Sequence, residues 1–269
     1  MAKRPTEPSL REGLRSFVAE RHPFGLTAVL RVFDVLKSHD DLMRVRDHMR
    51  HALPDAIRTQ LTNDAWPAID TTPGIGSDAR ARQASDELIE AVDGFFARTE
   101  IAQSFTDEER LEMLQGMLLT RAVDNRLKQF FSGGEVKYGS ASFQGKGFRS
   151  LGQEAIYAAP LRMRRGLKWR TSDGRWNGDV VAPLIRDLGA ALAMRGDAGA
   201  VRQVLSAQMG KAGPPMDGRD IHIGDFDWGV LPASAPLAIS TLTAAGMGCG
   251  FAHAGDGRVA VSFIGEGGS

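Results

Sequence analysis

The sequence predicts an α/β protein in which a parallel sheet is flanked by helices and preceded by a helical N-terminal extension. The run 258–264 is apolar and β-branched, is introduced by the turn Asp256-Gly257 and is closed by a glycine-rich loop. A second short, buried strand is expected at 178–183, ahead of a helix at 188–194. The first hundred residues, by contrast, carry apolar side chains at helical spacing. Strand, glycine-rich loop and helix together are typical of a sheet that binds its ligand at the carboxyl ends of the strands.

Residues 1–105 are expected to form helices with polar faces. Apolar residues recur at helical spacing within 26–36, and the polar segment 38–41 provides a cap for the next helix. The stretch 63–79 is rich in proline and glycine, so we expect a flexible connection there. Another helix is expected at 82–98.

Residues 106–269 are expected to hold the α/β part. Thr106 is followed by three acidic residues, which is typical of a helix start, and later apolar positions predict a long amphipathic helix. A polar, glycine-rich segment then leads to 150–155, where a second helix is expected to begin. The stretch 237–254 is rich in small residues and favours one closely packed helix.

The composition restricts the class of protein. Thirty-three Lys plus Arg balance 33 Asp plus Glu, so no strong field favours nucleic acid or an acidic membrane surface. No stretch reaches the run of about 18 apolar residues that a membrane span needs. Cys249 is the single cysteine, which excludes an internal disulfide, and the N-terminus shows no targeting segment. We therefore expect a cytoplasmic protein with no nucleic-acid or membrane partner.

The segment Gly265 to Ser269 is the first candidate site. Glycines directly after a buried strand let backbone N–H groups approach a diphosphate, because they have no Cβ and permit positive φ. Glu266 between two glycines presents a carboxylate suited to a divalent ion such as Mg²⁺. A tight surface turn with a solvated acid explains these five residues equally well.

A rival site lies upstream, at Gly246 to Gly250, which resembles a dinucleotide-binding fingerprint. The register fails, because Phe251 and His253 stand where the pattern requires glycine. Close packing of a small-residue helix is the better explanation of these glycines.

Two further side chains are candidates for function. His222 lies in the Gly/Pro-rich stretch 211–224, where an imidazole could exchange a proton near neutral pH. Arg186 follows the expected strand at 178–183 and could contact phosphate. A surface histidine and a solvated arginine are the alternatives, so the functional interpretation depends on the whole set.

Taken together, these segments resemble the alpha subunit of the decarboxylating first component of 2-oxo acid dehydrogenase complexes, of the pyruvate and branched-chain type. The resemblance covers about residues 107–269 and implies the thiamine-diphosphate-binding fold, incomplete at the C-terminus. It rests on six motifs in family order, which are Arg121-Ala122-Val123-Asp124, Gly152-Gln153-Glu154-Ala155, Ile185-Arg186, Gly218-Arg219-Asp220-Ile221-His222, Ala235-Pro236-Leu237-Ala238 and Gly265-Glu266-Gly267.

The resemblance also implies roles for single residues. Arg186 would contact the diphosphate of the cofactor. Ile185 would supply packing in the cofactor site where the family usually has tyrosine, a change that removes the aromatic contact. Ala235 and Leu237 would line the central cofactor pocket, with Leu237 supporting the bent shape of thiamine diphosphate. His222 would lie near the mouth of the site as a contact for substrate or intermediate.

The glycine-rich end would hold the charged part of the cofactor. Gly265, Gly267 and Gly268 would bind phosphate through backbone N–H groups. Glu266 would coordinate Mg²⁺ where many family members have aspartate, a change that preserves the carboxylate.

The implied activity is oxidative decarboxylation of a small 2-oxo acid with thiamine diphosphate and Mg²⁺, followed by acyl transfer to lipoamide. The implied partners are a beta subunit, or a fused beta half, and a lipoyl-bearing acyltransferase. Because the resemblance places the rest of the diphosphate motif and a catalytic loop beyond Ser269, we expect this chain alone to be inactive. The alternatives are an NAD-dependent oxidoreductase that uses Gly246 to Gly250 and a noncatalytic assembly module.

Overall fold

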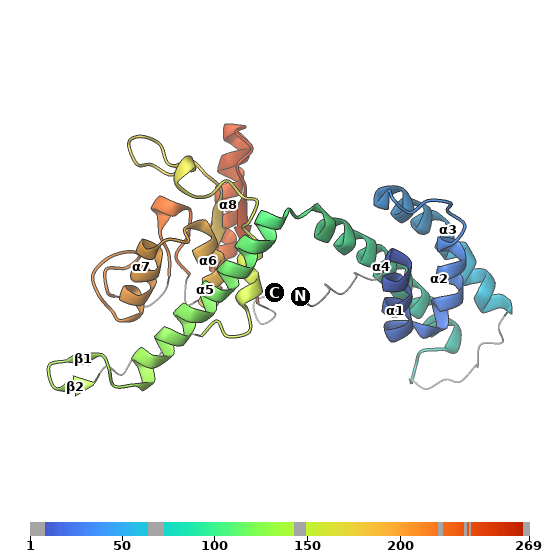
Figure 1. The fold of residues 1–269 in the computed structure, drawn as a ribbon, viewed down its shortest axis with the longest axis horizontal. Helices are drawn as coiled ribbons and strands as arrows, with labels where there is room; N and C mark the ends of the chain where they lie inside the picture. The colour runs from blue at the N-terminus through green and yellow to red at the C-terminus, as the bar shows by residue number, and fades with distance from the viewer. Residues whose placement is uncertain are drawn as a thin grey trace, which may run out of the picture. The chain divides into compact units, whose positions relative to one another are not determined.

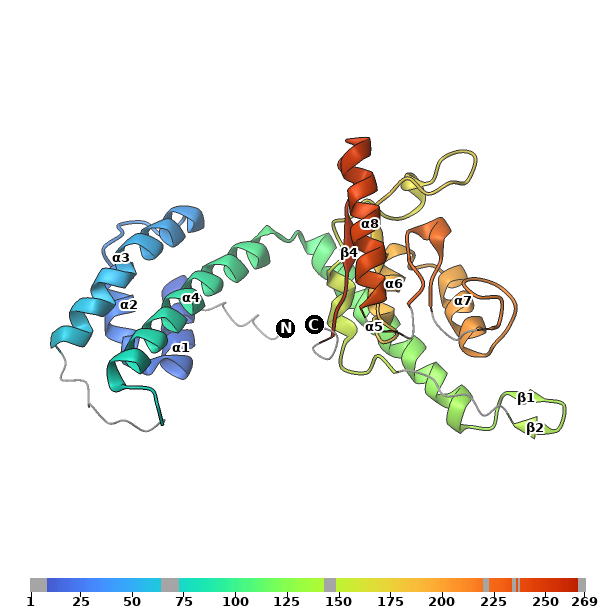
Figure 2. The same ribbon diagram turned by 180° about the vertical axis from the view of Figure 1, so that it is seen from behind.

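The protein is a mixed α/β molecule that is mostly helical and contains a small parallel sheet. The chain divides into two compact units, Met1–Phe105 and Thr106–Ser269, whose elements are drawn in Figures 1 and 2. The structure, a computed structural model, describes residues 9–63, 73–142, 149–219, 223–233, 236 and 238–265.

The described residues of the first unit form four α-helices and a short 3₁₀ turn, and two of the helix starts have side-chain caps. Ser9 and Glu12 form a reciprocal capping box at the first helix. Asp41 accepts the backbone N–H of Arg44 at 3.1 Å, which confirms the cap expected within 38–41. The elements are α1 (Leu10–Arg21), η1 (Pro23–Gly25), α2 (Leu26–Phe33), α3 (Leu42–Asn63) and α4 (Ser77–Ser104).

The apolar faces of these helices meet in one core. Leu88 of α4 packs so closely on Gly25 that a Cβ on the glycine would overlap the leucine side chain. On the rim, the carboxylate of Asp93 accepts hydrogen bonds from the guanidinium groups of Arg46 and Arg50, which joins α4 to α3. These bonds hold the pKa of Asp93 well below its ordinary value.

The connection between α3 and α4 is shorter than the stretch expected at 63–79. The helix α4 begins at Ser77, earlier than the expected start at 82, because Gly76 is extended and the residues after it suit a first helical turn. Residues 64–72 of the expected connection lie outside the described residues.

The second unit contains a long helix, a short hairpin, a two-stranded parallel sheet and three further α-helices within its described residues. The α-helices are α5 (Asp107–Ser132), α6 (Leu188–Met194), α7 (Ala198–Gln208) and α8 (Ile239–Ala254). The strands are β1 (Lys137–Tyr138), β2 (Ala141–Ser142), β3 (Val180–Ala182) and β4 (Ala260–Ser262), and the 3₁₀ turns are η2 (Glu154–Ala158), η3 (Leu167–Trp169) and η4 (Phe226–Trp228).

The core of this unit lies where α5, α6 and α7 pack together (Figure 1). Every residue of α6 is buried, and Leu192 and Met194 lie at the centre of the core. Thr106 caps α5 in a reciprocal box with Glu109, as the sequence predicts. The predicted helix at 188–194 is confirmed by α6.

The two strands β3 and β4 form a parallel pair, with Val180 opposite Ala260 and Ala182 opposite Ser262. Figures 1 and 2 show α8 lying alongside β4, and α8 also contacts β3. The strands predicted at 178–183 and 258–264 are confirmed, although each is shorter than its apolar run. The helix predicted at 237–254 is confirmed by α8, but the close packing expected of it is not, because its buried residues are limited to Ser240, Ala244 and Phe251.

The second helix expected to begin within 150–155 is not formed. The structure has the 3₁₀ turn η2 there, followed by further turns with i to i+3 hydrogen bonds. Ala159 has helical backbone angles (φ −60°, ψ −46°), so Pro160 does not prevent helical geometry at the residue before it, and its missing N–H removes only a donor that would continue a helix. The helix α5 instead supplies the long surface against which η2 packs.

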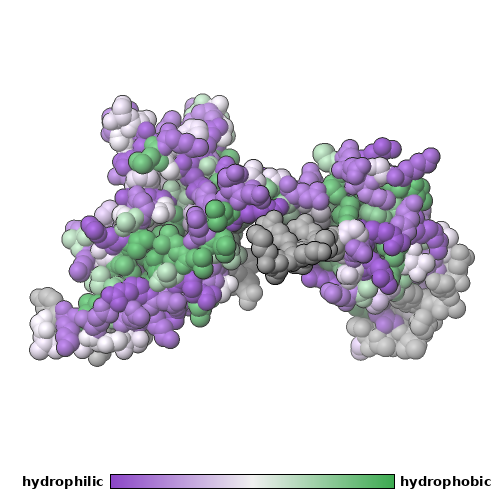
Figure 3. All heavy atoms as spheres, in the orientation of Figure 1, coloured by the Kyte–Doolittle hydropathy of each residue, from purple (hydrophilic) through white to green (hydrophobic). Residues whose placement is uncertain are grey.

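On the face drawn in Figure 3, hydrophilic side chains cover much of both units, whereas hydrophobic ones gather over the part of the second unit where α5 runs. Leu111, Leu114 and Leu118 are all more than half exposed and lie on the outer side of α5. Among the described residues, no helix combines the length and apolar character required to cross a bilayer.

Candidate functional site

The carboxyl ends of β3 and β4 lie at the same edge of the sheet because the two strands are parallel. Just beyond the strands, the N–H of Phe263 donates to the carbonyl of Ala182 at 3.1 Å. A Cβ placed on Gly265 would lie 3.7 Å from Cδ1 of Leu184. The glycine after β4 is therefore a direct neighbour of the turn after β3, and these segments form what we call the carboxyl edge.

The turn 184–187 at this edge is closed by Asp187. Its carboxylate accepts the N–H of Leu184 at 2.8 Å, and its own N–H donates to the carbonyl of Leu184 at 3.0 Å. Asp187 is buried, and this burial raises the pKa of its carboxyl group. Between these two residues, Ile185 is half-buried and Arg186 is exposed.

Arg186 is connected to α5 through the segment that precedes η2. Its Nη1 donates to the carbonyl of Arg149 at 3.0 Å. The next N–H along the chain, that of Ser150, donates to Oδ1 of Asp124 at 2.7 Å. The guanidinium of Arg149 donates to Oδ2 of the same carboxylate at 2.8 Å and 2.5 Å, and Asp124 is only 1% exposed.

A second carboxylate fastens the following residues to α5. Glu154 is buried and accepts a hydrogen bond from Nε of Arg121 at 2.5 Å and another from the N–H of Gly152 at 3.2 Å. The guanidinium of Arg121 is the largest cause that lowers the pKa of Glu154, which falls to about 2. The segment 149–154 is therefore held on α5 at two points.

Of the predicted site residues, the structure places Ile185 and Arg186 in the turn after β3, and it places Gly265 beside Leu184 of the same turn. The remaining predicted residues lie outside the described residues, so their positions stay predictions. They are His222, Ala235, Leu237, Glu266, Gly267 and Gly268.

The described part of the edge suits the phosphate end of an anionic cofactor. An exposed guanidinium at residue 186 and a glycine without a Cβ at residue 265 offer charge and close access to the backbone. Within the described ranges, no group of three or more His, Cys, Asp or Glu could hold a metal ion. The predicted metal ligand, Glu266, is not among these residues.

Asp124, Arg149 and Asp187 are parts of this site that the sequence analysis does not assign. Asp124 falls on the buried face of α5 beside Val123 and Leu127. An acidic residue among apolar core positions is unusual, and this is the feature of the sequence that could have identified Asp124 as a site residue. The link from Arg149 to Arg186 has no comparable signal, because it joins residues far apart in the chain.

The rival dinucleotide site has a different local structure from the one its chemistry requires. Gly246 and Gly250 lie within α8, away from its first turn. A dinucleotide-binding fingerprint needs a loop between a strand and the start of a helix, so that free N–H groups face the pyrophosphate. These glycines are instead part of a continuous helix. A Cβ on Gly246, Gly248 or Gly250 would meet nothing within 4 Å, so the close packing expected at these glycines is not observed either.

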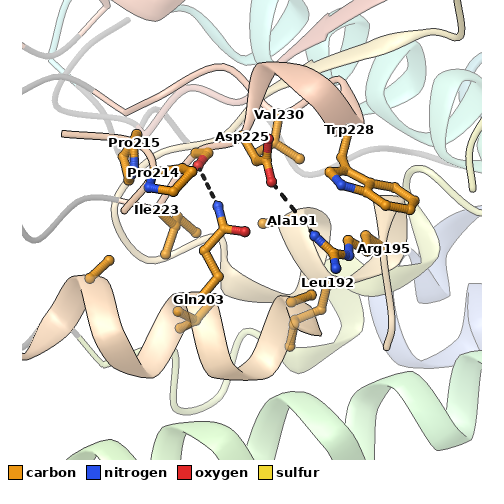
Figure 4. Close-up of a pocket in the computed structure, with 14 residues that line it drawn as sticks. Ala191, Leu192, Arg195, Gln203, Pro214, Pro215, Ile223, Asp225, Trp228 and Val230 are labelled. Atoms are coloured by element: carbon orange, nitrogen blue, oxygen red, sulfur yellow. Dashed lines mark hydrogen bonds and ion pairs between the residues drawn. The ribbon is translucent and has the colours of Figure 1, made fainter. Parts of the chain in front are cut away.

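A small cavity lies between α6, α7 and the loop that precedes η4 (Figure 4). Its volume is about 30 Å³, which is room for about one water molecule, and most of its lining is apolar. Nη1 of Arg195 lies 3.8 Å from Oδ2 of Asp225, and Gln203 donates to the carbonyl of Gly224 at 3.1 Å. The guanidinium of Arg195 also lies 4.3 Å from the centre of the Trp228 ring. The cavity is therefore a packing feature that joins two helices to a loop.

Comparison with known proteins finds no matching family model, no similar curated protein and no similar solved structure.

Proposed function

We propose that this chain is the cofactor-holding part of a thiamine-diphosphate-dependent 2-oxo acid dehydrogenase, equivalent to part of its alpha subunit. The single observation that carries the proposal is the pairing of β3 with β4. It brings Gly265 beside the turn that contains Arg186, and these residues belong to two motifs that are separate in the sequence. Ligands of α/β sheets bind at such carboxyl edges.

The described residues would act on the diphosphate end of the cofactor. Arg186 would neutralise phosphate charge and donate hydrogen bonds to phosphate oxygens. Gly265 leaves room for phosphate to approach the backbone, and Glu266 would supply a carboxylate to Mg²⁺. Thiamine diphosphate, when bound, supplies the electron sink for loss of CO₂ from the 2-oxo acid. Asp187 would keep the turn that carries Arg186 closed.

The remaining parts of the enzyme would come from other segments. Ala235 and Leu237 would line the pocket around the middle of the cofactor, and His222 would contact substrate. A beta subunit or fused beta half would complete the site, and a lipoyl-bearing acyltransferase would receive the acyl group.

Calorimetric titration tests the proposal. We expect the chain, extended past Ser269 by the segment in which the resemblance places the rest of the diphosphate motif, to bind thiamine diphosphate in the presence of Mg²⁺ and not to bind NAD. Arg186→Ala should weaken binding about tenfold or more, because it removes a charge-assisted hydrogen bond. Lys168→Ala is the matched control, since it removes an exposed positive charge from η3, outside the carboxyl edge. Binding of NAD without a response to thiamine diphosphate would contradict the proposal.

A further inference from the structure

We propose that Asp124 is a positioning residue, which sets the guanidinium of Arg186 for a diphosphate at the carboxyl edge without touching the ligand. The inference deepens the proposed function and rests on it for the identity of the ligand. The link between the two side chains is the peptide unit that joins Arg149 to Ser150.

Asp124 is a fixed point on the rigid helix α5. Its carboxylate is 1% exposed and is held by three donors, which are two guanidinium nitrogens of Arg149 and the N–H of Ser150. A buried carboxylate is retained in a core when donors of this kind satisfy it. Its direction is therefore set by α5 and not by solvent.

The peptide unit between Arg149 and Ser150 carries this direction to the edge of the sheet. A trans peptide is planar, so its N–H and C=O point to opposite sides. Asp124 accepts the N–H of this unit at 2.7 Å, and Arg186 donates to its C=O at 3.0 Å. When Asp124 holds the N–H of Ser150, the planar peptide unit therefore keeps the carbonyl of Arg149 pointing towards the guanidinium of Arg186. The negative charge on the N–H side also polarises the peptide and strengthens the bond that its carbonyl accepts.

Glu154 provides a matched comparison within the same segment. It is also a buried carboxylate paired with an arginine, in this case Arg121 of α5, and it also accepts a backbone N–H, that of Gly152. The peptide unit that it holds is different from the one that contacts Arg186. Loss of either carboxylate loosens the segment 149–154, but loss of Asp124 alone releases the carbonyl that holds Arg186.

The first measurement needs no ligand. In protein labelled with ¹⁵N-arginine, the Nε–H signal of Arg186 is assigned by its loss in Arg186→Lys. We expect this signal to shift, and its hydrogen exchange to accelerate, in Asp124→Asn and not in Glu154→Gln. Asp124→Glu keeps the charge and displaces the carboxylate by one methylene, and it replaces Asp124→Asn if the latter does not fold. An unchanged Arg186 signal in the Asp124 variant overturns the inference, whatever the ligand result.

The second measurement uses thiamine diphosphate with Mg²⁺ as the probe. We expect Asp124→Asn to weaken binding about five- to tenfold and Glu154→Gln to weaken it less than about twofold. In an Arg186→Ala background, Asp124→Asn should have no further effect, because its influence passes through Arg186. Equal losses in the two carboxylate variants, or an undiminished loss in the Arg186→Ala background, overturn the inference.

The two measurements separate this inference from the proposed function. If the wild-type protein does not bind the probe, the proposed function fails, and the Arg186 signal alone decides whether Asp124 positions the guanidinium. If the probe binds and the Arg186 signal changes in the Asp124 variant but not in Glu154→Gln, both the proposed function and the positioning role of Asp124 are supported.

Discussion

Gly116 shows how one missing Cβ determines the packing of α5. A Cβ at this position would overlap the ring of Tyr157, which is buried. We predict that Gly116→Ala lowers the free energy of unfolding of the second unit by about 1–3 kcal/mol, because the ring cannot move without disturbing the core. Urea denaturation measures this loss.

Gly246→Ala is the matched control for Gly116→Ala. Gly246 is also inside a helix, but a Cβ there would meet nothing within 4 Å. We expect a gain of about 0.5–1 kcal/mol, since alanine favours helix more than glycine does. A loss of similar size in both variants would contradict the role of Tyr157.

Asp187 is expected to make the free energy of unfolding fall as the pH rises, which is the opposite of the usual effect of an acidic residue. Burial raises the pKa of Asp187 above its ordinary value of 3.8. Between that value and the folded-state pKa, the native protein binds more protons than the unfolded chain. The free energy of unfolding therefore falls as the pH rises through this window. We predict that Asp187→Asn removes this decline, as measured by urea denaturation at a series of pH values.

Glu154 is expected to change the stability with pH in the opposite direction to Asp187. Because its folded-state pKa is lowered to about 2, its contribution to stability is present above about pH 4.5 and is lost as the pH falls towards 2. The destabilisation caused by Glu154→Gln should therefore shrink on acidification.

For the Asp187 prediction, parallel pH profiles of the wild type and Asp187→Asn would show that Asp187 is not responsible for the decline in the free energy of unfolding with rising pH.

At the scale of the element, the start of α5 depends on its cap. Thr106 accepts the N–H of Glu109 at 3.1 Å, and the Glu109 carboxylate accepts the N–H of Thr106 at 3.0 Å. We predict that Thr106→Ala destabilises the second unit by about 1 kcal/mol, because an N–H in the first turn loses its acceptor. Thr106→Ser keeps the hydroxyl and should cost much less. Chemical denaturation of both variants tests the cap, and equal losses would argue against it.

The elements that could be predicted are those with local signals. The cap at Thr106, the strands β3 and β4 and the helix α8 follow from neighbouring residues, whose periodicity and turn chemistry act over a few positions. The helix predicted to begin within 150–155 is wrong, because the local pattern does not distinguish a run of 3₁₀ turns from an α-helix.

The candidate site could be predicted only in part. Arg186 and Gly265 were singled out because each directly follows an expected strand, and parallel strands share one edge. Asp124 was missed as a site residue because its link to Arg186 passes through the backbone of a segment distant in the chain. Such a contact depends on tertiary packing, which the local pattern does not contain.

At the scale of the whole molecule, the two units have separate cores. The cluster that contains Leu88 draws its described residues from Met1–Phe105, and the cluster that contains Leu192 draws its described residues from Thr106–Ser269. We predict that Leu88→Ala lowers the stability of the first unit by about 2–5 kcal/mol and shifts one calorimetric transition.

Leu192→Ala is the reciprocal variant and should shift the other transition. In addition, Leu88→Ala should leave the affinity for thiamine diphosphate unchanged, since its core lies in the other unit. Movement of both transitions in each variant would show that the units unfold together.

The pairing of β3 with β4 also delays the folding of this sheet during synthesis, because β3 is made before its partner. Asp179, just before β3, accepts the N–H of Val259, which lies 80 positions later in the chain. At a translation rate of about 5–20 residues per second, β3 emerges about 4–16 s before its partner. During that interval the apolar segment Val180–Ala182 lacks its neighbouring strand. The edge that gathers Arg186 and Gly265 therefore cannot assemble before β4 is made, and a nascent chain halted before β4 would present a hydrophobic strand to chaperones.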